Sequence, residues 1–161
     1  MLLNDRDHVL ENVQIRVLRP LDASGFEPQR FEIVDEITSH NLVTTVGKGA
    51  IAERMKASPG AAGNPITHMG IGTNATAAAV GNTALGAEVD RNALDSTAVS
   101  GAVVTYVATF AAGDPSGTNA ITEAGLFSAS TSGNMWARVV HGSISKDTSL
   151  ALQYTWTLTF S

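Results

Sequence analysis

The chain has 161 residues, the length of one domain or of one domain with an extension, and a chain of this size buries enough surface to fold without covalent staples. It contains no cysteine, which excludes disulfides and thiolate metal sites. The 10 Lys and Arg against 15 Asp and Glu give a net charge of −5, which argues against a nucleic-acid-binding surface.

The first 39 residues predict an amino-terminal arm or a hairpin. Residues 13–17 alternate apolar and polar side chains, as a half-buried strand does, and residues 31–37 form a weaker strand pattern. Between them, residues 20–28 contain a glycine and two prolines, which are turn residues. The beginning of the chain does not resemble a secretory signal, and no apolar run approaches the roughly 20 residues of a membrane helix, so we expect no membrane contact.

Residues 41–57 are the best helix candidate, with apolar side chains near helical spacing and Asn41 as the expected amino-terminal cap. Gly47 and Gly49 weaken this helix by about 1 kcal/mol each relative to alanine. Residues 58–65 contain two prolines and two glycines and indicate a linker.

From residue 66 onward the pattern is that of β-structure, with a loop expected over residues 73–86. Residues 150–160 alternate strictly between apolar and mostly Thr side chains, which places Trp156 on the core face of a strand. The sequence therefore predicts an all-β fold: an antiparallel β-sandwich or jelly-roll-like body over residues 40–161, with one short helix and an extended amino-terminal arm. The expected strands are 66–71, 88–94 (strand or turn), 101–111, 121–127, 135–141 and 150–160.

Charge is unevenly distributed along the chain. Residues 61–161 contain 3 Lys and Arg and 6 Asp and Glu, which is about a third of the usual share of charge. One interpretation is that much of this surface faces protein neighbours, since soluble monomers usually carry a charged surface. The alternative is a β-surface covered with Thr and Ser.

No catalytic or metal-binding pattern stands out, so we expect a non-enzymatic protein without a cofactor. No two of the four histidines share one face of one element; they are His8, His40, His68 and His141. The glycines of residues 70–75 lack the lysine and the helix of a phosphate-binding loop and indicate a turn. The nucleophile motif Gly-x-Ser-x-Gly is absent from the sequence.

Glu123 is the most informative charged residue, because it lies in an otherwise apolar strand. The other members of its predicted face are Ile121, Gly125 and Phe127. Since an unpaired buried charge is very costly, we expect Glu123 to form a structural ion pair with Arg91 or Arg138. The alternative is that Glu123 is an acid catalyst, but the sequence shows no second catalytic residue to act with it. Glu88 and Asp90 are expected to form an exposed or paired cluster with Arg91.

Several segments together resemble a known family. They are residues 40–44, 66–72, 121–127, 133–138 and 154–160, with sequences HNLVT, ITHMGIG, ITEAGLF, GNMWAR and YTWTLTF. In this order they resemble small virion structural proteins of tailed bacteriophages, and a related pattern occurs in the amino-terminal domain of tail-collar fibre proteins. The resemblance spans about residues 40–161, and its motifs are structural rather than catalytic.

The resemblance implies a β-sandwich that attaches to a virion assembled in the host cytoplasm. It favours a capsid decoration (cement) protein, whose partner is the major capsid protein and which forms a homo-oligomer, commonly a trimer. A tail, baseplate or fibre-attachment protein is the alternative. Residues 1–39 would then dock on the assembly or complete a neighbour's sheet.

Two other classes remain open. A carbohydrate- or receptor-binding β-module would use Trp136 to stack on a sugar, because Trp156 is expected in the core. An enzyme would have to use scattered residues such as His68, Glu123 or His141.

Overall fold

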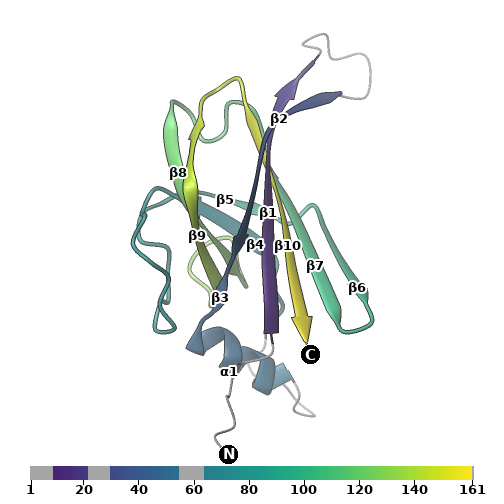
Figure 1. Ribbon diagram of the computed structural model, residues 1–161. Helices are drawn as coiled ribbons and strands as arrows, with labels where there is room; N and C mark the ends of the chain where they lie inside the picture. Colours follow the sequence, from purple (N-terminus) through teal and green to yellow (C-terminus); the bar gives the residue numbers. More distant parts are fainter. Residues whose placement is uncertain (1–8, 22–29, 55–63, 161) are drawn as a thin grey trace, which may run out of the picture.

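A computed structural model describes residues 9–21, 30–54 and 64–160 of the chain. These residues form two antiparallel β-sheets packed face to face, with one short helix, α1, at one end (Figure 1). The predicted all-β sandwich with a single short helix is therefore confirmed. Within the described ranges, no helix is long and apolar enough to cross a membrane.

The first sheet has five strands, and the amino-terminal strand lies inside it. In spatial order they are β2 (Phe31–His40), β1 (Val9–Pro20), β10 (Ala151–Phe160), β7 (Val103–Phe110) and β6 (Ser96–Ser100). The alternation along β10 places Leu152, Tyr154, Trp156 and Leu158 in the core, and Trp156 is fully buried as predicted. Phe160, at the end of the strand, is exposed.

The second sheet also has five strands. In spatial order they are β3 (Leu42–Val43), β9 (Met135–Lys146), β8 (Asn119–Phe127), β4 (His68–Gly72) and β5 (Glu88–Ala93). Register shifts interrupt the pairing of β8 with β9 after Ile121 and after Leu126. Such bulges change which face of the sheet a side chain occupies.

The main core lies between the two sheets and includes the amino-terminal strand. Val13 and Ile15 of β1 are fully buried in the same cluster as Leu126, Val139 and Trp156. For residues 1–39 the sequence predicts an arm or a hairpin, and their described part forms the hairpin β1–β2. Strand β1 lies inside the sheet, between β2 and β10, and is not an extended arm. The loop predicted at residues 20–28 lies mostly outside the described residues.

Helix α1 (Thr45–Arg54) begins later than predicted. The predicted cap was wrong: Leu42 and Val43 pair with β9, and the Asn41 side chain has no hydrogen-bond partner among the described residues. Thr44 caps the helix instead, because its Oγ1 accepts a hydrogen bond from Gly47 N at 3.0 Å. Residues 55–57 of the predicted helix and most of the linker at 58–65 lie outside the described residues.

Several strands differ from their predicted extents. Strand β6 was missed because its side chains are all exposed and carry no alternating pattern. Residue Gly101, predicted to start a strand, instead forms the turn between β6 and β7 with φ at +58°. Strand β9 runs on to Lys146, and β5 takes the strand alternative of the prediction.

The loop of residues 73–87 connects β4 to β5 and covers the outer face of the second sheet. Beneath it, Leu85 packs with Phe127 and Met135 in a second, smaller apolar cluster. This loop matches the predicted one at 73–86, and it gives the second sheet two buried faces. A charged side chain on the outer face of β8 is therefore buried rather than solvated.

Candidate functional site

A buried ion pair joins β8 to β9 beneath the loop of residues 73–87. Arg138 Nη2 lies 2.8 Å and Nε lies 2.9 Å from Glu123 Oε2. The two side chains are 3% and 0% exposed. Arg138 pairs in register with Gly125, two residues from Glu123, so the two charges are diagonal neighbours on adjacent strands.

The Glu123 carboxylate also binds the backbone of the covering loop. Its Oε1 accepts hydrogen bonds from Ala87 N at 2.8 Å and from Asn74 N at 3.3 Å, and its Oε2 accepts one from Gly86 N at 3.0 Å. A carboxylate has about four acceptor positions, and these bonds together with Arg138 occupy them. Both ends of the loop are thereby held by one side chain.

Arg138 holds the middle of the same loop. It donates hydrogen bonds to Thr76 O at 3.0 Å, to Asn82 Oδ1 at 3.1 Å and to Ala77 O at 3.4 Å. The ion pair thus anchors loop residues 73–87 to the second sheet. Both oxygens of Glu123 and the donors of Arg138 are thus engaged by groups of the described residues.

The predicted face of Glu123 was correct only in part. Gly125 and Phe127 share the outer face with it, but Ile121 packs in the main core. The register shift between Ile121 and Glu123 is the reason, since one extra residue on a strand turns the following side chains to the opposite face.

Arg91, the other candidate partner of Glu123, lies elsewhere. Its guanidinium forms a bidentate pair with Glu88, with both N–O distances at 2.7 Å. It also donates to the carbonyl oxygens of Ala129 and Ser132 and lies 3.5 Å above the ring of Phe127. Arg91 therefore ties β5 to the loop before β9 and covers the outer apolar cluster.

The glycine-rich segment at 70–75 contributes strand β4 and the start of the loop. A Cβ on Gly72 would lie 2.5 Å from Ala87 O and 2.6 Å from Glu123 Oε1. Only glycine therefore lets the loop backbone and the Glu123 carboxylate approach this position so closely. A phosphate-binding loop would be followed by a helix, and within the described residues no helix follows this segment.

The described histidines do not converge on a metal-binding cluster, and His8 lies outside the described residues. His141 is buried between Gly142 O, 2.8 Å from Nδ1, and the Tyr154 hydroxyl, 3.2 Å from Nε2. Because a carbonyl only accepts, Nδ1 donates to Gly142 O, and in the neutral ring Nε2 accepts from the Tyr154 hydroxyl. Burial lowers the pKa of His141, in agreement with this assignment.

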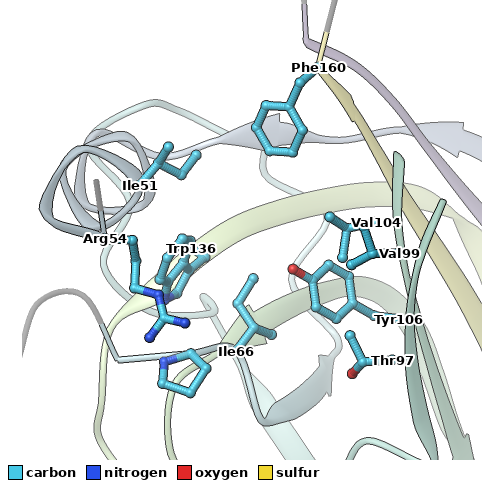
Figure 2. A pocket seen from close by; sticks show the side chains of 10 residues that line it. Ile51, Arg54, Ile66, Thr97, Val99, Val104, Tyr106, Trp136 and Phe160 are labelled. Atoms are coloured by element: carbon cyan, nitrogen blue, oxygen red, sulfur yellow. The ribbon is translucent and has the colours of Figure 1, made fainter. Parts of the chain in front are cut away.

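A cavity of about 430 Å³ opens at the end of the sandwich where α1 ends (Figure 2). Its walls come from α1, from both sheets and from the segment before β4. They are Ile51, Arg54, Pro65, Ile66, Thr97, Val99, Val104, Tyr106, Trp136 and Phe160. Trp136, considered above as an exposed sugar platform, is only 8% exposed and instead forms part of this wall.

Sequence reasoning did not find this cavity. Its residues are spread from position 51 to position 160, and they meet because α1 docks against β9. Thr44 N and Thr44 Oγ1 both donate to carbonyls of β9, at 3.0 Å to Trp136 O and 2.7 Å to Met135 O. The sequence feature that could have indicated the contact between α1 and β9 is Gly47, because its lack of a side chain lets its Cα pack against the Trp136 backbone.

Exposed apolar side chains gather at the opposite end of the molecule from α1. Among the residues that the structure describes, eight large apolar side chains are exposed, and four of them belong to the β1–β2 hairpin or its end: Leu21, Phe31, Ile33 and Val34. In Figure 1 this end of the hairpin leans away from the sandwich.

No protein-family model, curated protein or solved structure matches this chain. The resemblance to virion proteins therefore remains a prediction from the sequence motifs.

Proposed function

We propose that this chain is a non-enzymatic structural protein of a tailed-bacteriophage virion, namely a capsid decoration protein that binds the assembled head and stabilises it. The family resemblance of residues 40–161 suggests the class. The observation that best supports an assembly role is the exposed edge of the first sheet.

Strand β2 forms that edge, and none of its ten residues is buried. Its backbone groups on the outer side face away from β1, and Phe31, Ile33 and Val34 are exposed by 39%, 52% and 36%. An exposed edge strand presents unpaired backbone N–H and C=O groups that can pair with another chain. A neighbouring chain in an assembled shell would cover β2 and complete the sheet.

The charged residues of the hairpin fit this role. Arg16 pairs with Glu36 at 2.9 Å and Arg19 with Glu32 at 3.6 Å, across β1 and β2. These partly exposed pairs keep the hairpin hydrated before assembly while leaving little net charge to repel a partner. The low charge of residues 61–161 supports the same interpretation, because surfaces buried between chains are depleted in charge.

Attachment in many copies explains how such a protein would stabilise a shell. A ligand that binds only the assembled shell stabilises it in proportion to the logarithm of its concentration over its dissociation constant. The expected homo-oligomer, a trimer, would add multivalent contacts with the major capsid protein and raise the effective concentration.

The test is to count labelled copies of the protein on purified particles. On the order of hundreds of copies distributed over the head is the expected result for a shell-decorating protein. A small fixed number of copies at the tail end would contradict decoration and favour the tail or baseplate alternative. Absence from particles would overturn the virion role.

A pair of variants tests the edge strand directly. Phe31→Ser combined with Ile33→Ser should lower the number of bound copies while leaving the folded monomer intact, because both side chains are exposed. Val80→Ser is the matched control, since Val80 is also exposed, by 51%, but lies on the loop of residues 73–87. Equal occupancy for both variants would show that β2 is not the contact.

A further inference from the structure

The edge strands of the two β-sheets differ in how well they are protected against pairing with another chain. Within the described residues, β2 and β6 are the edges of the first sheet, and β3 and β5 are the edges of the second. Proteins usually protect such edges with charged side chains, with bulges or with very short strands. An edge without these devices is open to pairing with another strand.

Three of the four described edges carry this protection. Strand β2 contains three carboxylates and no lysine or arginine, and a register shift interrupts its pairing with β1. Strand β5 contains Glu88 and Asp90, its cation Arg91 is bound to Glu88, and a register shift interrupts its pairing with β4. Strand β3 is only two residues long. Strands β2 and β5 therefore disfavour pairing with copies of themselves, because like charges opposite each other are destabilising.

Strand β6 has none of these devices. Its five residues, with the sequence STAVS, carry no charge and no proline, and they pair with β7 without a register shift. All five are exposed, and among the described residues no strand pairs with their other side. The nearest charged residue in the sequence, Asp95, precedes the strand. The outer backbone N–H and C=O groups of β6 are therefore available to another strand.

An apolar surface adjoins this open edge. Val99 of β6 is 71% exposed, whereas no other large apolar side chain of the described residues exceeds 53%. Val99 and Thr97 line the cavity beside α1, together with Val104 of β7 and Phe160 of β10, which is 39% exposed (Figure 2). A strand added beside β6 would therefore satisfy the backbone of the edge and also cover Val99.

The charge pattern of the edges favours a second copy of this chain as the added strand. In a two-fold contact each surface meets an identical surface, so the interface must tolerate its own charges. Strand β6 does so because it has none, and antiparallel pairing places the two copies of Asp95 at opposite ends of the paired strands. The same pairing sets Val99 of one copy opposite or diagonal to Val99 of the other, and β-branched side chains in these positions favour strand pairing.

We propose that two copies of the chain pair antiparallel through β6 and join their five-stranded first sheets into one sheet of ten strands. The contact lies on the edge opposite β2, so β2 stays available for the virion contact. This inference goes beyond the proposed function, and it makes the homo-oligomer a dimer instead of the trimer that the family resemblance suggests. Because one five-residue strand forms a small contact, the dimer is weak, with a dissociation constant in the micromolar to millimolar range.

Sedimentation equilibrium of the full chain, up to millimolar concentration, measures the association. A monomer–dimer equilibrium is the expected result. A monomer at every concentration, or a trimer, would overturn the contact through β6. Neither result would affect the virion role, which depends on the copies counted on particles.

Charge variants of Val99 identify the contact. Val99→Lys and Val99→Asp should each weaken self-association about tenfold, because each sets like charges side by side across the two-fold contact. An equimolar mixture of the two variants should recover the dimer, because opposite charges then face each other. Since Val99 is 71% exposed, neither change disturbs the core, and the recovery in the mixture separates a lost contact from a lost fold.

Val34→Lys and Val34→Asp are the matched controls, because Val34 is also exposed, by 36%, but lies on β2. Both should leave self-association unchanged. If the Val99 variants associate as strongly as the unmodified chain, or if their mixture does not recover the dimer, the contact is not formed by β6.

Discussion

Glu123 and Arg138 form an ion pair that connects two strands of the second sheet and also holds the loop that covers them. The pair joins adjacent strands through contacts of 2.8 and 2.9 Å, and the same two side chains hold the backbone of residues 73–87. A charge pair with so many backbone partners fixes a loop that otherwise has few apolar contacts. We therefore expect that loss of the ion pair also loosens the loop.

Glu123→Gln should destabilise the protein by about 3–5 kcal/mol, because it leaves the Arg138 guanidinium buried without a counter-charge. Denaturant unfolding measures the loss, and hydrogen exchange at Gly86 and Ala87 should accelerate. Glu36→Gln is the control, since the half-exposed pair with Arg16 contributes less than about 1 kcal/mol. Similar losses for the two variants would show that burial does not strengthen the Glu123 pair.

The two glycines of α1 should respond in opposite directions to alanine. Gly49 has open space around its Cα, so Gly49→Ala should stabilise the protein by up to about 1 kcal/mol through helix propensity. In Gly47→Ala the new methyl group meets the backbone carbonyl of Trp136, which cannot move aside, so we expect a loss of about 1–3 kcal/mol. Thermal unfolding of both variants checks this, and stabilisation by Gly47→Ala would mean that α1 does not dock on β9 as described.

Stability should decline in mild acid because of His141. Burial lowers its pKa in the folded state below the ordinary value of 6.5, so the unfolded chain takes up a proton that the folded protein resists. The contribution of His141 is fully present above about pH 6.5 and is lost as the pH falls through the folded-state pKa. Denaturant unfolding between about pH 5 and pH 8 should show this slope. His141→Gln should remove it, and an unchanged slope in that variant would assign the effect to another group.

Asp90 and Asp147 should have opposite effects on stability. Burial, and then the nearby charge of Asp114, raise the pKa of Asp90, so its ionisation in the folded protein is unfavourable and stability falls as the pH rises from about 3.8 through the raised value. Asp90→Asn should therefore stabilise the protein at neutral pH.

Hydrogen bonds from the Ser149 hydroxyl and backbone lower the pKa of Asp147, so Asp147→Asn should lose a contribution that is present above about pH 3.8 and vanishes in acid. Unfolding curves of both variants at neutral and acid pH test the two signs. Shifts of the same sign would contradict the assigned environments.

The strands with strict alternation were predictable from sequence because the side-chain period of a strand is two. The pattern of β10 placed Trp156 in the core, where it lies. Strand β6 and the late start of α1 were not predictable in this way. The side chains of β6 are all exposed, and Leu42 and Val43 pair with β9 only because that strand is brought beside them.

The chain's own residues determined that Glu123 must have a counter-charge, since a carboxylate within an apolar strand cannot remain unpaired. The tertiary structure decided that the partner is Arg138. Strand β9 lies directly beside β8, whereas Arg91 is on β5, beyond β4, and is already bound to Glu88. Likewise the sequence indicated the alternation that builds the sandwich, but the cavity beside α1 exists only because segments from residue 51 to residue 160 converge there. Local patterns specify which face of a strand is buried, while neighbours distant in sequence are chosen by the packing of the sheets.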